Sequence, residues 1–251
     1  MQPTDHNTAT VAIIIAILGL MIGMAKGGFG GLGVLLTPLL ALVLPVTSAV
    51  GVLLPMLMVG DVFALAMYWK QWDLTVLKSM LPAGIIGAIA GTLLLSRLSP
   101  NGLRISLGIF VLVIVIYKFT SDRIQAIQYE ARSWHGPAAG LLAGVASGMF
   151  NSGGPPFNSY LLLNKVQARP FIATAAIYFA VLNLIKVPGF LYTGVLNLPM
   201  LLSVWWVFPF IPIGILVARL MLVRVSPAVF EWIIMVLLIF SSLWLLLSGV
   251  G

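Results

Sequence analysis

The chain has 251 residues, of which 61% are hydrophobic and only 8% are charged, whereas about 25% of the residues in a soluble globular protein carry a charge. This composition indicates an integral membrane protein and excludes a soluble enzyme, a nucleic-acid-binding protein and a disordered chain. The net charge of +7 arises from single basic residues between apolar runs, and in a membrane protein such residues indicate orientation. The chain has no cysteine, which excludes disulfides and cysteine-bound metals.

Apolar runs follow one another along the whole chain, and a membrane-spanning helix needs about 20 apolar residues. Six runs are long enough to span, namely 46–69, 75–96, 101–119, 168–192, 198–222 and 227–249. Four shorter runs form two pairs, 11–26 with 30–44 and 136–150 with 154–164. A glycine-rich break interrupts each of these pairs.

Rare residues recur at a nearly constant spacing, which indicates two related halves. The spacing is 125 residues in the early part of each half and 127 residues in the later part. The aligned pairs include Gly23 with Gly148, Gly28 with Gly153, Arg97 with Arg224, and Pro100 with Pro227. We therefore expect a first transmembrane repeat at 1–119, a cytoplasmic linker at 120–135 and a second repeat at 136–251, an organisation common among transporters.

The distribution of basic residues predicts that the two repeats are inverted. If each split pair returns to the side on which it started, one side of the membrane collects nine basic residues and the other collects two. The nine are Lys70, Lys78, Lys118, Arg123, Arg132, Lys165, Arg169, Arg219 and Arg224, and the two are Arg97 and Arg104. If each pair crossed once as a single helix, this bias would vanish. The positive-inside rule therefore predicts an all-α polytopic membrane protein of two inverted repeats, each a broken re-entrant helical pair plus three spanning helices, with both termini outside.

The two breaks, which read Lys-Gly-Gly-Phe-Gly-Gly at 26–31 and Asn-Ser-Gly-Gly-Pro-Pro at 151–156, form the candidate binding site. Irregular backbone at membrane depth is tolerated only inside the protein or beside a water-filled cavity. A helix that starts at a break directs N–H groups and a positive dipole end toward that cavity, so we expect a small anion near the midplane. The predicted binding residues are Lys26, Gly27, Gly28, Asn151, Ser152, Gly153 and Gly154, with Asn158, Ser159 and Asn183 as further candidate donors. Alternatively, the glycines of the breaks, and the flanking Gly19, Gly23, Gly144 and Gly148, serve only close helix packing.

Three ionisable residues, Lys26, Asp61 and Lys186, lie well inside apolar runs. Such residues cost about 2.5–3.5 kcal/mol on insertion and indicate function. Asp61 and Lys186 occupy matching positions at the 125-residue spacing, so we expect either a buried Asp61–Lys186 pair or a coupling proton on Asp61. The alternatives are a purely structural ion pair and a Lys186 side chain that extends to the membrane interface.

Signatures of enzymes are missing from the sequence. The two histidines, His6 and His135, lack the spacing of a zinc site, and the chain has no phosphate-binding loop for ATP. We therefore predict that the protein is not an enzyme and has no catalytic residue, bound metal or cofactor.

Two motifs resemble those of a known family. Residues 23–33 read Gly-Met-Ala-Lys-Gly-Gly-Phe-Gly-Gly-Leu-Gly, with Thr-Pro-Leu-Leu at 37–40, and residues 148–156 read Gly-Met-Phe-Asn-Ser-Gly-Gly-Pro-Pro. Together they resemble the sulfite exporter TauE/SafE family of bacterial membrane permeases, and the resemblance extends over nearly the whole chain. It implies transport of small sulfur-containing anions, such as sulfite or organosulfonates such as sulfoacetate, across the bacterial inner membrane.

The sequence favours a secondary transporter or exporter of a small anion, embedded in the lipid bilayer. The alternatives are a membrane-embedded binding or assembly subunit without transport, and an anion channel. The paired breaks favour the transporter, and buried charges of both signs favour alternating access over a channel. The expected partners are a small anionic substrate and a coupling ion, either a proton or sodium. Oligomerisation is compatible with the sequence, and no nucleic acid is expected.

Overall fold

The computed structural model describes residues 5–124, 132–221 and 227–250, and all regular structure within these ranges is helical. The elements are α1 (Asp5–Gly27), η1 (Gly30–Val34), α2 (Leu36–Ala41), α3 (Val46–Met67), α4 (Leu74–Arg97), α5 (Pro100–Ile124), α6 (His135–Phe150), α7 (Gly154–Leu163), α8 (Ala168–Tyr192), α9 (Leu198–Val204), η2 (Trp205–Val207), α10 (Phe210–Met221) and α11 (Pro227–Val250). Part of the predicted linker, 125–131, and the basic residue Arg224 lie outside the described ranges.

Six helices within the described ranges are long and apolar enough to cross a membrane. They are α3, α4 and α8, together with α1 from Thr10, α5 up to Thr120 and α11 from Trp232 to Gly249. All except α1 correspond to runs that the sequence predicted as spans. The all-α polytopic membrane fold is therefore confirmed.

Helix α1 is longer than the sequence indicated, because the prediction treated 11–26 as a short arm of a split pair. The helix begins at Asp5 and contains 23 residues, or about 34 Å at 1.5 Å per residue. Helical hydrogen bonding needs no apolar side chains, so the polar residues before the apolar run extend the helix at its N-terminal end. The first arm is thus long enough to span a membrane by itself.

The run 198–222, predicted as one span, is broken near its middle. Its two parts, Leu198–Val207 and Phe210–Ala218, are bent by 46° relative to each other and count as a seventh span only if they are taken together. Pro209 lies at the bend, where it offers no N–H and its ring clashes with the preceding turn of a straight helix. The proline therefore accounts for the difference from the predicted straight helix.

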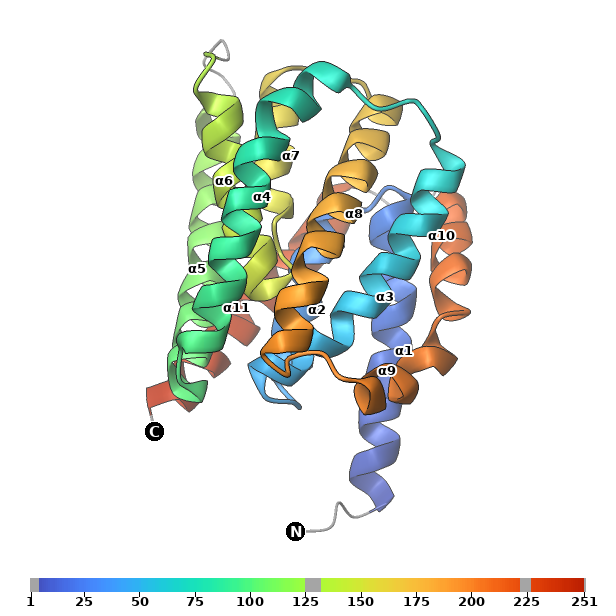
Figure 1. Ribbon diagram of the computed structural model, residues 1–251, viewed down its shortest axis with the longest axis vertical. Coiled ribbons are helices and arrows are strands. Elements are labelled where there is room, and N and C mark those ends of the chain that lie inside the picture. The colour runs from blue at the N-terminus through green and yellow to red at the C-terminus, as the bar shows by residue number, and fades with distance from the viewer. Residues whose placement is uncertain (1–4, 125–131, 222–226, 251) are drawn as a thin grey trace.

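Helices α6 and α7 together form a short pair around the second break. They contain 16 and 10 residues, or about 24 and 15 Å, so each is shorter than the hydrocarbon core of about 30 Å. The two helices contact each other. Figure 1 shows both at the end of the molecule opposite to the marked chain termini. This is the arrangement expected of a re-entrant pair, whereas the inverted relation of the two halves stays a prediction.

Glycines bring two helix pairs into unusually close contact. A Cβ atom added at Gly144 of α6 would overlap the carbonyl oxygen of Gly84 in α4. In the same way, a Cβ atom at Gly23 of α1 would overlap the carbonyl oxygen of Ile211 in α10. These glycines, which flank the breaks, do serve the close helix packing that the sequence offered as an alternative.

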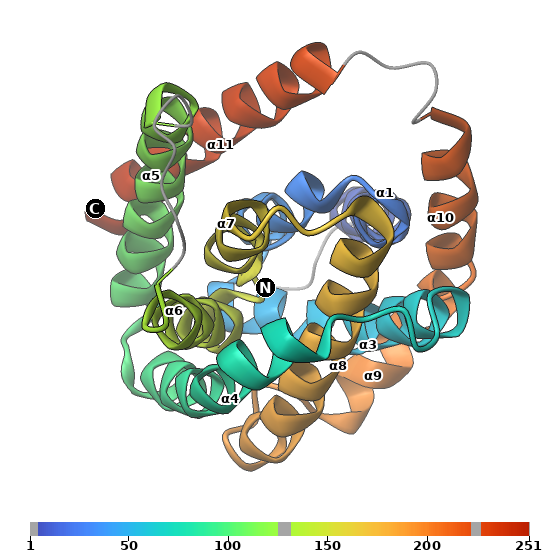
Figure 2. The ribbon, with the colours of Figure 1, turned by 90° about the horizontal axis from the view of Figure 1, so that it is seen from above.

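The second break is largely buried in the helix assembly, and the first break is half-buried and becomes exposed at Gly30 and Gly31. Figure 2 shows α1 and α7 near the centre, with α5, α11 and α10 along the left, upper and right outer edges and α3, α4 and α8 in the lower half of the view. The end of α6 is tied to α2, because the Thr37 hydroxyl donates a hydrogen bond of 2.5 Å to the carbonyl oxygen of Phe150. The two interrupted segments, far apart in the sequence, therefore meet in the middle of the molecule.

Candidate functional site

The first break follows the last turn of α1, where Lys26 is located. A cation at this position is favoured by the carbonyl groups that end a helix. Gly28 has a φ of 137°, a conformation that side chains other than hydrogen rarely allow. The next element, η1, is a short 3-10 helix of five residues, and an α-helix begins only at Leu36, so the helix expected to start directly at this break is not α-helical.

The second break is held by Asn151, which ends α6 in the left-handed conformation with a φ of 54°. Its amide Nδ2 donates a hydrogen bond of 2.9 Å to the carbonyl oxygen of Val50 in α3. Helix α7 then starts with two prolines in its first turn, which pre-form the helix but lack N–H groups. The backbone donors at this helix start are therefore the N–H groups of Gly153 and Gly154.

A cavity of about 130 Å³ lies between the two breaks. From the first break and η1 it is lined by Lys26, Gly28, Gly30 and Gly33, and from the second break and α7 by Asn151, Ser152, Gly153, Gly154 and Asn158. Every predicted binding residue except Gly27 thus borders one space. Gly27 instead packs on α10, where an added Cβ atom would lie 2.8 Å from the Cβ atom of Ala218.

Helix α8 forms another wall, of which the sequence predicted only Asn183, and the lining also includes Leu36 of α2, Leu57 and Ala64 of α3 and Ser147 of α6. The lining residues of α8 include the aromatic side chains of Phe171 and Phe179. The Phe179 ring centroid is 5.7 Å from the Lys26 ammonium, within the range of a cation–π interaction. The candidate donor Ser159 is not among the residues that line this cavity, and its hydroxyl bonds the carbonyl oxygen of Pro155 at 2.7 Å.

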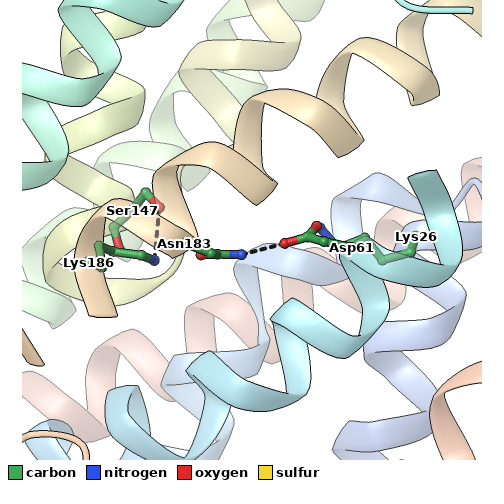
Figure 3. A network of polar contacts seen from close by, with 5 residues as sticks. All are labelled: Lys26, Asp61, Ser147, Asn183 and Lys186. Carbon is green, nitrogen blue, oxygen red and sulfur yellow. Dashed lines mark hydrogen bonds and ion pairs between the residues drawn. The ribbon is translucent and has the colours of Figure 1, made fainter. Parts of the chain in front are cut away.

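Asp61 of α3 forms an ion pair with Lys26. Its second carboxylate oxygen accepts a hydrogen bond of 2.6 Å from Nδ2 of Asn183, and the carboxylate is almost fully buried. Lys26 is the only charged side chain among the described residues that line the cavity. The site therefore consists of a cation at the cavity wall and a buried carboxylate that pairs with it and does not line the cavity. Figure 3 shows Asp61 between Lys26 and Asn183.

Lys186 does not pair with Asp61, which corrects the expected Asp61–Lys186 ion pair. Its ammonium group donates to Oδ1 of Asn151 at 2.6 Å and to the carbonyl and hydroxyl oxygens of Ser147 at 3.1 and 3.2 Å. Asn183, one helical turn earlier on α8, takes the position next to Asp61, as Figure 3 shows. The Lys186 side chain is 1% exposed, so the expectation that it reaches the membrane interface is also wrong.

We expect Lys186→Met to loosen the second break specifically. The substitution removes a hydrogen bond from a charged donor to Asn151, and such a bond contributes about 1.5–3 kcal/mol. Hydrogen exchange of the backbone amides at 151–154 should therefore speed up about tenfold or more, while exchange at 26–31 changes little. Hydrogen-exchange mass spectrometry measures both segments.

A matched control for this experiment is Lys165→Met, which removes an exposed lysine outside the cavity. Equal acceleration in both variants would show that Lys186 does not hold the break.

Comparison with known proteins agrees with the motifs. The family model for the sulfite exporter TauE/SafE matches residues 15–245. No curated protein and no solved structure matches the chain. The family consists of membrane transporters of the sulfite-exporter type, which is consistent with the predicted non-enzymatic function. Because the match covers nearly the whole chain, this protein belongs to the sulfite exporter TauE/SafE family.

Proposed function

We propose that the protein is a secondary transporter that carries a small sulfur-containing anion, such as sulfite or an organosulfonate, across the bacterial inner membrane. The observation that carries this proposal is the cavity between the two breaks, with Lys26 as the charged group in its wall. Membership of a sulfite-exporter family supports the substrate class. A coupling ion, a proton or sodium, accompanies the anion.

The cavity lining suits an oxyanion. Asn158 offers its side-chain amide, Asn183 offers the N–H group that it does not donate to Asp61, and the backbone N–H groups of Gly153 and Gly154 lie at the start of α7. Ser152 also lines the cavity, but its hydroxyl donates to the carbonyl oxygen of Phe150. An anion with two or three charged oxygens needs several such donors, and neutral donors provide them without adding net charge to the bilayer. The aromatic residues of α8 that line the cavity, Phe171 and Phe179, provide contacts for the organic part of a sulfonate.

We further propose that the halves act as inverted repeats around this site, with both termini outside. Two equivalent contacts support the repeat: Lys26 bonds Asp61, and Asn151 bonds Lys186. The 125-residue spacing equates 26 with 151 and 61 with 186, so the two contacts join matching positions. Alternating access by rocking of one half against the other fits this arrangement.

Flux into proteoliposomes tests the proposal, with radiolabelled sulfite, sulfate and methanesulfonate as probes. Gly33 lines the cavity, and a Cβ atom added there meets nothing within 4 Å. The variant Gly33→Val should therefore fold normally but fill part of the cavity, and we expect it to lower sulfite or methanesulfonate flux about tenfold, equivalent to about 1.4 kcal/mol.

The matched control is Gly31→Val, two positions earlier in η1 and outside the cavity lining. An added Cβ atom at Gly31 has an ordinary contact of 3.4 Å with Ile234, so this variant should transport like the wild type. Absence of flux of all three anions in the wild type would contradict the proposed function. Equal flux in the two variants would place the anion elsewhere.

A further inference from the structure

We propose that the Asp61 carboxylate substitutes for the transported anion in the empty transporter, and that anion binding displaces it from Lys26 and loads it with one proton. Anion and proton then cross the membrane together. This inference rests on the proposed function, because it names the coupling ion and the residue that carries it.

The geometry makes the carboxylate and an incoming anion competitors for one ammonium group. Lys26 lines the cavity and is the partner of Asp61. The side chain of Lys26 is 14% exposed and that of Asp61 is 3% exposed. An anion in the cavity therefore approaches the exposed side of the Lys26 ammonium group, whose buried side is paired with Asp61.

Lys186 is not available for this role. Its ammonium group already has three acceptor oxygens, from Ser147 and Asn151, and the residue is 1% exposed. An ammonium group has only three hydrogens to donate, so an anion at Lys186 would have to break bonds that hold the second break. The cation that exchanges partners is therefore Lys26.

The balance of buried charge favours simultaneous uptake of a proton. In the empty site Lys26 and Asp61 form an ion pair, which carries no net charge. A bound monovalent anion together with a protonated Asp61 leaves the same net charge. Without the proton, the displaced carboxylate would lie unpaired beside the anion, and an unpaired charge in a membrane interior is strongly unfavourable.

Access to the carboxylate depends on anion binding. Lys26 and Asn183 line the cavity, whereas Asp61 lies behind them and does not. When the Lys26 ammonium turns toward the anion, it uncovers the carboxylate oxygen that it had covered. A hydronium ion in the cavity water then transfers its proton to this oxygen: one O–H bond of the hydronium ion breaks, a carboxyl O–H bond forms, and a water molecule is left. The proton is thus taken up after the anion arrives, as obligatory coupling requires.

Asn183 is suited to both ionisation states of Asp61. In the structure its Nδ2 donates to the carboxylate, and its side-chain carbonyl can accept a hydrogen bond from a protonated carboxyl after a half-turn of the amide. A side chain with a donor and an acceptor in one planar group therefore keeps the carboxyl partnered throughout the cycle.

The surroundings of Asp61 contain few other charges. The charged groups that face it are Lys26 from α1 and, beyond Asn183, Lys186 from α8 (Figure 3). Helices α2 and α9, which also pack on α3, have no charged residue. Helices α5 and α10 pack on α3 with apolar residues such as Leu107 and Ile211. The charge of the carboxylate is therefore compensated chiefly by Lys26.

The first test measures methanesulfonate binding to the purified wild-type protein by calorimetry at several pH values. The charge of this probe does not change over the range used, so any pH dependence comes from the protein. Uptake of one proton with each anion makes the affinity rise as the pH falls, approaching tenfold per pH unit. In proteoliposomes, entry of methanesulfonate should acidify the interior, as reported by an enclosed pH-sensitive dye.

The second test uses Asp61→Asn. Because the competition for Lys26 is removed, methanesulfonate should bind to this variant more tightly than to the wild type at neutral pH. The affinity should no longer vary with pH, and entry of methanesulfonate should no longer acidify the interior of the proteoliposome. A purely structural role for Asp61 predicts weaker binding instead. The control is Asp73→Asn, because Asp73 caps α4 from outside the cavity and asparagine caps a helix equally well. This control should keep the wild-type pH dependence.

The outcomes separate this inference from the proposed function. Anion flux that carries no proton in the wild type, or a wild-type affinity independent of pH, overturns the inference and leaves anion transport standing. Weaker methanesulfonate binding by a folded Asp61→Asn protein also overturns it. No binding and no flux of sulfite, sulfate or methanesulfonate contradicts the proposed function itself. If Asp61→Asn fails to fold, the wild-type pH dependence and dye signal decide.

Discussion

Replacement of Lys26 by glutamine should weaken anion binding about 10- to 150-fold, since a hydrogen bond to a charged group contributes about 1.5–3 kcal/mol. Lys26 is the charged side chain in the cavity wall, so no other lining residue can replace its attraction. The variant also leaves the Asp61 carboxylate without its ion-pair partner.

Stability and binding must be measured separately for this variant. Removal of one partner from a buried ion pair costs about 3–5 kcal/mol, so Lys26→Gln should also melt at a lower temperature. The double variant Lys26→Gln/Asp61→Asn removes both charges and should recover much of this stability while still binding the anion weakly. Recovery of affinity together with stability would show that Lys26 acts only as a partner of Asp61. Lys78→Gln, at an exposed position of α4, provides the matched control.

The spans and breaks were predictable because each has a local cause in the sequence. The runs that became α3, α4, α5, α8 and α11 are apolar over a membrane thickness and end at polar residues. At the second break, Pro155 and Pro156 cannot continue α6 but can start α7. Gly28 has the positive φ that only glycine adopts easily. Such features depend on a few consecutive residues.

The partners of the buried charges were not predictable, because they depend on how helices rotate against one another. Equivalent positions in two repeats suggested Asp61 with Lys186, yet the contacts join Asp61 with Lys26 and Lys186 with Asn151. Each lysine thus bonds a residue of its own half. The spacing of 35 residues within each contact is the signal that would have found this arrangement. The position of Phe179 in the cavity wall could not be predicted from the sequence, because aromatic residues are common in apolar helices.

The close packing of α4 and α6 leads to a second large effect, which acts on folding. Gly144→Val should lower the free energy of unfolding by about 3 kcal/mol or more, the upper end of the range for overpacked cores. An added Cβ atom at Gly144 would overlap the Gly84 carbonyl oxygen and lie 2.8 Å from the backbone nitrogen of Ala88. These are backbone atoms, which cannot move aside as a flexible side chain can. Helix α6 must therefore separate from α4 along much of its length.

The second break begins where α6 ends, so this separation displaces Asn151 and the cavity wall with it. We expect the melting temperature of Gly144→Val to fall by about 6–12 °C and anion flux to be lost even though no lining residue has changed. Leu142→Val is the matched control, because Leu142 lies on the exposed side of the same helix and should tolerate valine with little loss of stability. Scanning fluorimetry in detergent measures both variants. Equal melting temperatures of Gly144→Val and Leu142→Val would contradict this prediction, because they would show that α4 and α6 can separate without loss of stability.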